Sequence, residues 1–398
     1  MKVLLSAYAC EPGKGSEPEV GWQLATGIAR RGHDVWVVTR ANNRPGIERE
    51  LTERPVPNLH FAYFDLPPWG LRLKRWLGVN AYYRLWQSAA LPLARTLHEA
   101  IGFDRGQHVT FVSVRHPSFL RHLGIPYIFG PVAGGEHAPS AMLHGFPWLF
   151  RVKEATRILL TRVGMLAPSV QQTLRLATRV LVTSPQTLAL LPASIGAQAE
   201  VRLAISAPPP LAHPLPPREG TRQPLRILFV GRSQEWKGID LALVALAKLR
   251  DDGSSATLTL VSEGPDRPRL EARIAELGLN GFARFQPFVP RAELAAIYAA
   301  HDVLLFPSLR DSGGMVVLEA MQHGLPVICL ALGGPGQIVT EACGLAASAD
   351  DPDYAVAEMV GALRKMERHA DSYAACSSAA IRRVENFSIE RLLDALGY

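Results

Sequence analysis

Short apolar runs alternate with amphipathic segments along most of this chain. Residues 2–9 form the first run, and the segment after it carries apolar residues at helical spacing until it ends at Gly32. A second apolar run follows at residues 35–39. This order predicts a strand, a helix and a strand, and Ser16 with Glu19 is predicted to form a capping box where the helix begins.

The second half of the chain repeats this alternation. Strands are predicted at residues 226–230, 257–261, 283–285, 303–306 and 326–329, and helices between them at 240–249, 267–277 and 291–300. Alternating strands and helices favour a parallel, doubly wound sheet with ligand sites at the carboxyl ends of its strands. Neither half carries GxGxxG after its first strand, so a nicotinamide or flavin enzyme is not expected.

A proline-rich segment separates the two patterns. Residues 207–224 hold seven prolines in 18 positions, which disfavours both helix and central strand. We therefore predict an α/β protein of two Rossmann-like domains, residues 1–206 and 225–378, joined by a linker at 207–224. Residues 379–398 are expected to form a C-terminal helix that packs back on the N-terminal domain.

Composition agrees with a two-domain globular enzyme, since the chain has 398 residues, 48% of them hydrophobic and 20% charged. Its four cysteines show no CxxC spacing, so neither a zinc site nor a disulfide framework is expected. The first apolar run is too short for a signal peptide, and no stretch reaches the roughly 18 apolar residues of a spanning helix. A cytoplasmic protein is expected.

The positive charge is concentrated in the first half. Residues 1–206 hold 23 Lys and Arg against 13 Asp and Glu, whereas residues 207–398 hold 19 against 23. Aromatic residues accompany the basic ones at 69–87 and 146–162. Such segments suit an anionic membrane surface, but they are equally compatible with helices that pack their aromatics inward. No motif supports nucleic-acid binding.

The segment FPSLRDSGGMVVLEAMQHGLPVICLALGG (residues 306–334) carries the most specific chemistry. Two carboxylates, Asp311 and Glu319, flank Gly313, Gly314 and the start of a helix predicted over residues 315–323. A helix that begins behind a glycine turn offers unpaired N–H groups to a phosphate, while carboxylates accept hydrogen bonds from sugar hydroxyls. Phosphate and sugar together indicate a nucleotide sugar.

This segment resembles the signature of the retaining glycosyltransferases of family 4, which reads Pro-Ser-x-x-Glu-Gly-Phe-Gly-x-x-x-Leu-Glu-Ala. The chain differs in having Asp311 for the first Glu and Ser312-Gly313 for Gly-Phe. The resemblance implies a GT-B fold, in which two Rossmann-like domains face each other across a cleft. It also implies that Asp311 binds a hydroxyl of the donor sugar and Glu319 the ribose of the nucleotide.

Other family elements follow in the same half. GRSQEWKG (residues 231–238) matches the family's Gly-Arg and Lys-Gly pairs, so Arg232 and Lys237 are expected to hold the diphosphate in place of a metal ion. Gly333 and Gly334 match a Gly-Gly-x-x-Glu element with Gln337 in place of Glu, although packing of the turn explains these glycines equally well. The remaining residues expected to bind the donor are Gly264, Phe288, Gly313, Gly314, Met315 and Val316.

In the first half, the resemblance implies a glycine loop near the donor phosphate and the acceptor, and a histidine that touches the donor sugar. His108 and His116 are both candidates for the histidine, and His108 is preferred for its distance from Asp104. Glu136 is expected to orient an acceptor hydroxyl. The residues assigned to the glycine loop are Gly13, Gly15, Ser16 and Glu17.

The function expected from these residues is retaining transfer of a hexose from a nucleotide-diphosphate sugar to a glycan or lipid-linked acceptor in cell-surface polysaccharide biosynthesis. Neither a metal nor a cofactor is expected, and the enzyme is expected to be cytoplasmic, at the inner face of the membrane. Two alternatives stay open. One is a GT-B epimerase acting on the sugar nucleotide, and the other is a non-catalytic sugar-nucleotide-binding protein, suggested by Asp311 and Gln337.

Overall fold

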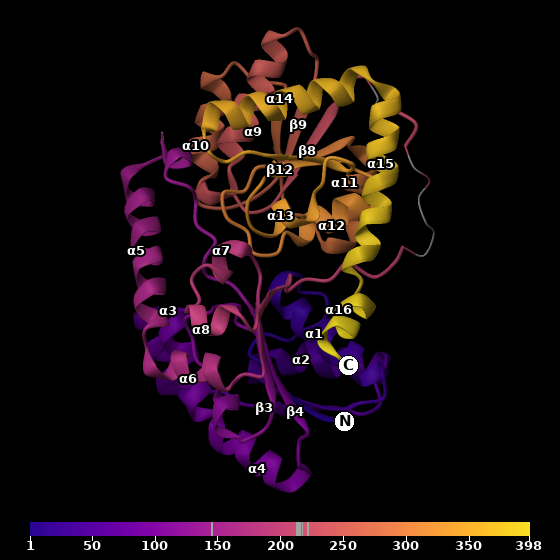
Figure 1. Cartoon of the computed structure of the whole chain (residues 1–398). Helices are drawn as coiled ribbons and strands as arrows, with labels where there is room; N and C mark the ends of the chain where they lie inside the picture. Colours follow the sequence, from indigo (N-terminus) through magenta and orange to yellow (C-terminus); the bar gives the residue numbers. More distant parts are fainter. Residues whose placement is uncertain (145, 212–215, 217, 221–222) are drawn as a thin grey trace. The chain divides into compact units, whose positions relative to one another are not determined.

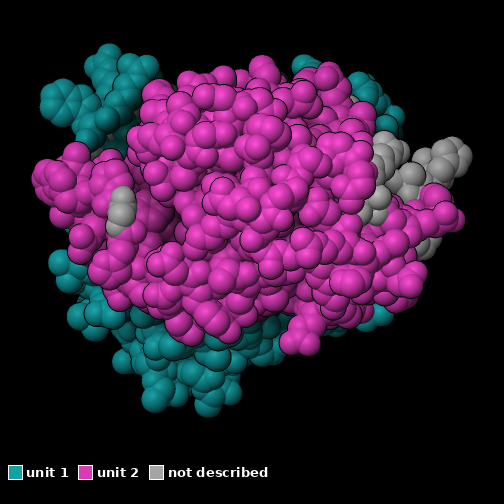
Figure 2. Space-filling view, turned by 90° about the horizontal axis from the view of Figure 1, so that it is seen from above, with its two compact units in different colours: residues 1–135, 156–206, 389–398 teal, residues 136–155, 207–388 magenta. Residues whose placement is uncertain are grey.

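A computed structural model of the chain describes residues 1–144, 146–211, 216, 218–220 and 223–398. The chain divides into two compact units, which are coloured separately in Figure 2. Unit 1 comprises residues 1–135, 156–206 and 389–398, and unit 2 comprises residues 136–155 and 207–388.

Unit 1 is built on a parallel sheet that, over the described residues, has seven strands in the order β3-β2-β1-β4-β5-β6-β7. The strands are β1 (Lys2–Ala7), β2 (Asp34–Thr39), β3 (Leu59–Tyr63), β4 (Arg105–Thr110), β5 (Tyr127–Val132), β6 (Arg179–Val182) and β7 (Ala199–Val201). Strands β1 and β5 are buried along nearly their whole length, as expected for a parallel sheet covered on both faces.

Helices connect the strands of unit 1 (Figure 1). They are α1 (Ser16–Arg30), α2 (Arg44–Glu53), α3 (Pro68–Ala89), α4 (Leu91–Ile101), α6 (Pro168–Leu176), α7 (Pro185–Leu188), α8 (Ala193–Gly196) and α16 (Ile389–Leu396). Gly78, with φ 80° and ψ 175°, interrupts the helical backbone inside α3. Helix α5 (Trp148–Met165) begins in unit 2 and continues into unit 1.

Unit 2 contains a second parallel sheet, with six strands among the described residues in the order β10-β9-β8-β11-β12-β13. The strands are β8 (Arg226–Val230), β9 (Thr257–Val261), β10 (Ala283–Gln286), β11 (Val303–Phe306), β12 (Val327–Leu330) and β13 (Gly344–Ala347). The helices are α9 (Ile239–Asp251), α10 (Arg267–Glu276), α11 (Arg291–Ala300), α12 (Met315–Gln322), α13 (Gly333–Ile338), α14 (Pro352–Arg368) and α15 (Ala370–Val384). Helix α14 packs on α9, and α15 packs on α12 (Figure 1).

Both sheets reverse their strand order at one point. The reversal lies between β1 and β4 in unit 1 and between β8 and β11 in unit 2. In doubly wound sheets, ligands bind beside such a switch point, at the carboxyl ends of the strands. The predicted fold class, two Rossmann-like domains, is therefore confirmed.

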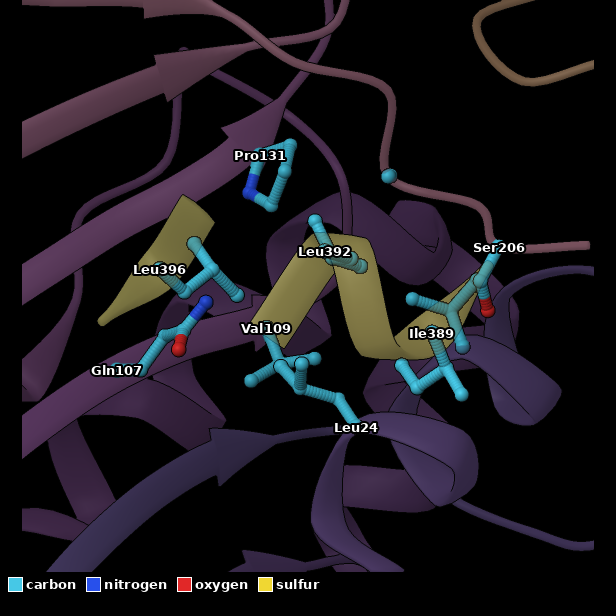
Figure 3. Close-up of a pocket in the computed structure, with 10 residues that line it drawn as sticks. Leu24, Gln107, Val109, Pro131, Ser206, Ile389, Leu392 and Leu396 are labelled. Carbon is cyan, nitrogen blue, oxygen red and sulfur yellow. The ribbon is translucent and has the colours of Figure 1, made fainter. Parts of the chain in front are cut away.

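The C-terminal helix α16 packs against α1 in unit 1. Arg31 Nη1 donates to Asp394 Oδ1 at 2.7 Å, and α16 closes a small apolar pocket over Leu24 of α1 and Val109 of β4 (Figure 3). Inside it, Gln107 donates to the Gly130 carbonyl and accepts from the Tyr398 hydroxyl. Because its polar groups are already paired, we interpret this pocket as a packing seam.

Two of the predicted domain bounds need correction. The returning segment is residues 389–398 and not 379–398, because α15 continues to Val384 as one helix of unit 2. Residues 136–155 belong to unit 2 although they precede residue 206, since their contacts are made with that unit. Both departures follow from tertiary packing, which the local sequence pattern does not report.

The predicted linker, residues 207–224, lies partly outside the described residues. Its described part is attached to unit 2: the N–H of Ala207 donates to the Phe387 carbonyl at 2.7 Å, and Gln322 donates to the Pro209 carbonyl at 2.8 Å. Arg218 donates to the carbonyl oxygens of Tyr298 and His301. These bonds fix the described end of the segment to α11 and its neighbours.

Candidate functional site

The residues predicted to bind the donor lie on loops at the carboxyl edge of the second sheet and on helix α12, which follows one of these loops. Because all strands of this sheet are parallel, the loops after β8, β9, β10, β11 and β12 emerge at the same edge. They are residues 231–238, 262–266, 287–290, 307–314 and 331–332. The structure therefore brings the predicted donor residues of the second half to one edge of unit 2.

An ion pair spans the switch point of this sheet. Lys237, after β8, places its Nζ 2.5 Å from Oδ2 of Asp311, after β11. Both side chains are 18% exposed, and the Lys237 ammonium also lies 5.1 Å from the centre of the Phe306 ring. An ammonium has three N–H donors, so Lys237 can hold an anion while it stays bonded to Asp311.

The second carboxylate oxygen of Asp311 is bonded to the start of α12. Its Oδ1 accepts hydrogen bonds from the N–H groups of Gly313 at 3.2 Å and Gly314 at 3.0 Å. The prediction of unpaired N–H groups at this helix start is therefore wrong for these two glycines, because the neighbouring carboxylate binds them first. Asp311 links the helix start to the Lys237 ammonium.

Two glycines permit the close packing of these loops. A Cβ on Gly333, which has φ +54°, would lie 2.1 Å from the Asp311 carbonyl oxygen, and a Cβ on Gly264 would lie 2.4 Å from the Ser233 carbonyl oxygen. Gln337 donates to the Gly333 carbonyl within its own helix at 3.0 Å. The structure thus explains Gly333, Gly264 and Gln337 by packing of the turns, and direct donor contact by Gly264 stays a prediction.

The remaining residues predicted to bind the donor sugar nucleotide differ in their exposure and in their hydrogen bonds. The Tyr298 hydroxyl donates to Glu319 Oε2 at 2.9 Å, which fixes that carboxylate on α12. Arg232 is exposed, and its side chain has no hydrogen bond or ion pair with any residue that the structure describes. Phe288 is half exposed, and its N–H donates to Glu263. Met315 and Val316 are partly exposed in the first turn of α12.

A second ion pair, next to the first, was not predicted. Arg310 Nη1 donates to Glu154 Oε2 at 2.7 Å, and the Arg310 guanidinium lies 4.3 Å from the centre of the Trp236 ring. Arg310 and Trp236 directly precede Asp311 and Lys237 in the sequence. The only sequence signal was the adjacency of these residues, and nothing marked Glu154 as their partner.

In unit 1, the predicted glycine loop lies after β1. The Glu17 carboxylate accepts a 2.5 Å hydrogen bond from the N–H of Val112, after β4, and thus spans the switch point of the first sheet. Burial raises the pKa of Glu17, although the backbone bonds from Val112 and Phe111 act in the opposite direction. Gly13 and Gly15 both have positive φ in this loop.

The capping box predicted for α1 is wrong. Gly15 is the cap residue, Ser16 has φ 49°, and no side chain caps the helix. The Glu19 carboxylate accepts from the N–H of Gly13 at 2.7 Å instead. The acid therefore closes the glycine loop and does not bond to Ser16.

Both candidate histidines are buried in unit 1. His108 lies inside strand β4, opposite Ser6 of β1, with its Nε2 3.3 Å from the Tyr83 hydroxyl. His116 follows β4, and its Nε2 lies 3.0 Å from Asn80 Oδ1. Burial lowers the pKa of His108 to about 4 and that of His116, beside Arg115, to about 3. His108 is 1% exposed and lies inside β4, so its expected place after a strand is wrong, while its contact with the donor stays a prediction.

Glu136 is also placed differently from the prediction. It is buried, at 7% exposed, and belongs to unit 2 instead of the N-terminal domain. The role predicted for it with an acceptor stays a prediction. The fold places residues 136–155 in unit 2 through Glu154 and its bond to Arg310.

Comparison with known proteins gives a family match for part of the chain. Residues 217–383, which contain all the donor loops, match the family model for "Glycosyl transferases group 1". The match supports a glycosyltransferase, as the motif predicted, and family 4 within this group stays a prediction.

Two curated relatives share part of the group 1 sequence. The chain is 36% identical over 146 residues to the 2-deoxystreptamine glucosyltransferase of Streptomyces kanamyceticus, covering 33% of this chain and 38% of the relative. It is 40% identical over 136 residues to the D-inositol 3-phosphate glycosyltransferase of Frankia alni, covering 32% of this chain and 33% of the relative. The matches thus span about a third of the length of each of these relatives.

Solved structures resemble the whole chain and confirm the GT-B fold. Sucrose-phosphate synthase of Thermosynechococcus elongatus aligns with a TM-score of 0.66 and 19% identity, over 99% of this chain and 96% of its own. HepE of Anabaena, in complex with UDP-glucose, aligns with a TM-score of 0.60 and 17% identity, over 100% and 99%. At such low identity the likeness establishes the GT-B fold and not a substrate.

Proposed function

We propose that this chain is a retaining, metal-independent glycosyltransferase that moves a hexose from a nucleotide-diphosphate sugar to a glycan or lipid-linked acceptor in cell-surface polysaccharide biosynthesis. The observation that carries the proposal is the Lys237–Asp311 ion pair, which spans the switch point of unit 2 inside the group 1 match. This is the place in a doubly wound sheet where a nucleotide is expected.

The residues of unit 2 fit the charges of this reaction. When the bond between the sugar and the diphosphate breaks, negative charge accumulates on the departing diphosphate. Lys237 retains N–H donors for that charge, and the exposed Arg232 extends from the same loop. In the proposed front-face displacement, the acceptor oxygen bonds to the anomeric carbon and its proton passes to the leaving phosphate.

Glu319 is proposed to bind the ribose. Its carboxylate lies on the second turn of α12, one helical turn after the loop that contains Asp311, and Tyr298 holds one oxygen in place. A carboxylate accepts hydrogen bonds from two neighbouring hydroxyls. UDP and UDP-glucose, which are bound in the HepE structures, are the first ligands to test.

Product analysis separates this proposal from its alternatives. UDP-glucose is incubated with the chain alone and with an acceptor panel that includes 2-deoxystreptamine and D-inositol 3-phosphate, after which two relatives are named. Transfer of the sugar to an acceptor supports the proposal. An epimerised nucleotide without acceptor would identify an epimerase, and binding without any conversion would identify a non-catalytic binding protein.

Metal independence gives a separate prediction. Because Lys237 and Arg232 are proposed to neutralise the leaving diphosphate, EDTA is expected to leave the rate of transfer unchanged. The measurement compares initial rates with and without EDTA, and a parallel EDTA sample with added Mg²⁺ serves as the control. Activity that EDTA abolishes and Mg²⁺ restores would contradict this assignment.

We also propose that the chain binds the inner face of the membrane through unit 1. Among the described residues, no helix is long and apolar enough to span a bilayer. Unit 1 nevertheless exposes large apolar side chains on helices that also carry exposed arginines. These apolar residues are Trp69, Trp76, Val79 and Leu85 of α3, Leu159, Leu160 and Val163 of α5, and Leu166 and Leu176 beyond it.

The orientation of α5 supports membrane binding. Within unit 1, its buried face carries Thr161 and Met165, while Leu159, Leu160 and Val163 lie on the exposed face. The apolar side chains of this helix thus face outward, the reverse of an ordinary surface helix. Exposed apolar residues beside arginines suit an anionic lipid surface.

In a vesicle sedimentation assay, the full chain is expected to pellet with anionic vesicles and not with neutral ones, and less so at high salt. Arg72 and Arg75 changed together to Glu should reduce pelleting several-fold. Lys74 is left unchanged because its ammonium lies over the Tyr82 ring.

Lys365→Glu with Arg368→Glu, on α14 of unit 2, makes the same change of net charge and is the control. Equal loss of binding in both double variants would indicate a net-charge effect. A protein that stays in the supernatant with anionic vesicles at low salt would contradict membrane binding and favour a soluble acceptor.

A further inference from the structure

Glu154 is an almost fully enclosed carboxylate on α5, at 2% exposed. Its two oxygens are bonded to two different segments of unit 2. Oε2 accepts from Arg310 Nη1 at 2.7 Å, and Oε1 accepts from the N–H of Ala138 at 3.3 Å. Glu154 therefore connects the loop that contains Glu136 to the loop that contains Asp311.

Arg310 links Glu154 to the two loops that carry Lys237 and Asp311. Its guanidinium stacks on Trp236 at 4.3 Å, and the Trp236 carbonyl accepts from the N–H of Leu309 at 2.8 Å. Two neighbouring contacts thus join the loop after β8 to the loop after β11. Arg310 stacks on Trp236, and Asp311 forms an ion pair with Lys237. A shift of the first contact moves the backbone that carries the second.

We infer that Glu154 is a positioning residue for glycosyl transfer: through Arg310 and Trp236 it holds Lys237 and Asp311 at a fixed position relative to residues 136–139. This inference rests on the proposed function, because it assigns Lys237 and Asp311 to the donor. A catalytic pair that is misplaced by about 1 Å loses on the order of 10² in rate, so a residue that fixes the pair is visible in kcat.

Stability alone does not account for the placement of Glu154. A buried ion pair contributes little net stability compared with apolar side chains of similar volume. Unit 2 contains a comparison in Asp302, which is also 2% exposed and pairs with Arg226 at 2.7 Å. Arg226 begins β8 and Asp302 precedes β11, so this second pair lies at the amino edge of the sheet, opposite the donor loops.

The test compares Glu154→Gln with Asp302→Asn in the full chain. UDP-glucose turnover and UDP affinity are measured at a temperature where both variants are folded. Glu154→Gln is expected to lower kcat about tenfold and to change UDP affinity less than threefold, because the charge-assisted bond to Arg310 is lost while the nucleotide contacts remain. Asp302→Asn is expected to lower Tm and to leave both quantities unchanged.

A readout that needs no turnover accompanies the kinetics. Lys237 acylation by an amine-reactive ester, followed by mass spectrometry, is expected to be several-fold faster in Glu154→Gln than in the wild type or Asp302→Asn. Arg310→Lys, which keeps the charge but loses the planar guanidinium, should show a labelling rate between those of the wild type and Glu154→Gln.

Wild-type kcat and wild-type Lys237 labelling in a folded Glu154→Gln chain would overturn the inference. So would equal kinetic losses in both acid variants. A wild-type chain that consumes no sugar nucleotide would contradict the proposed function, and the labelling rates would still decide whether Glu154 positions Lys237.

Discussion

Replacing Lys237 with alanine is expected to lower kcat for glycosyl transfer by about 10² to 10³, and to weaken donor binding much less. The difference arises because the charge on the leaving diphosphate is greatest in the transition state. The variant also leaves the Asp311 carboxylate without its cation, since Lys237 Nζ lies 2.5 Å from Oδ2. Steady-state rates against donor concentration, with calorimetric affinity for the nucleotide diphosphate, measure both effects.

Lys248→Ala is the matched control for Lys237→Ala. Lys248 lies on α9 of the same unit, is half exposed, and pairs with Asp353 at 3.6 Å. Its replacement should leave kcat within twofold of the wild type. If Lys237→Ala lowered donor affinity and left kcat intact, the lysine would bind the ground state only and would not stabilise the leaving group.

Glu319→Ala is expected to weaken binding of the nucleotide diphosphate by roughly 10- to 150-fold, since loss of a charged hydrogen-bond acceptor costs about 1.5–3 kcal/mol. The ribose hydroxyls are the groups that lose their acceptor. Isothermal titration of the folded variant with the nucleotide diphosphate measures the effect directly.

Tyr298→Phe separates ribose binding from the packing of α12. This variant removes the hydroxyl that donates to Glu319 at 2.9 Å but keeps the carboxylate. It should weaken binding of the nucleotide diphosphate less than Glu319→Ala does. Unchanged nucleotide affinity in Glu319→Ala would show that this carboxylate only bonds to Tyr298 within the fold.

The second domain could be predicted closely from the sequence. The strands predicted at residues 226–230, 257–261 and 303–306 coincide with β8, β9 and β11. These strands are buried on both faces, so each appears in the sequence as a continuous apolar run between turn residues. Such a run is typical of a strand in a parallel sheet.

The contacts between the loops could not be predicted in the same way. The motif marked Lys237 and Asp311 separately for a ligand, whereas the folded chain pairs them with each other. Likewise, the spacing of Asp311 and Gly313 did not reveal that the carboxylate bonds to the first N–H groups of α12. Such bonds depend on side-chain direction, which neither propensity nor periodicity specifies.

Glu154 shows most clearly what could not be predicted from the sequence. It pairs with Arg310, 156 positions away in the sequence, and no motif in its own helix marks it as a partner of the donor residues. His108 gives the opposite case, because a histidine near a strand end suggested a ligand contact and the fold buried it inside β4. In both cases the tertiary packing decides which groups the side chain contacts.

The central claim is that unit 2 binds a nucleotide diphosphate through Lys237, Arg232 and Glu319. The most direct measurement is thermal unfolding of the full chain with UDP, GDP and ADP, each compared with its monophosphate. A ligand at 100 times its Kd stabilises the fold by about 2.7 kcal/mol, which corresponds to a Tm increase of roughly 5–10 °C for a unit of this size. The account predicts such an increase with one diphosphate and a smaller one with its monophosphate. No increase with any diphosphate, or an equal increase with the monophosphate, would contradict it.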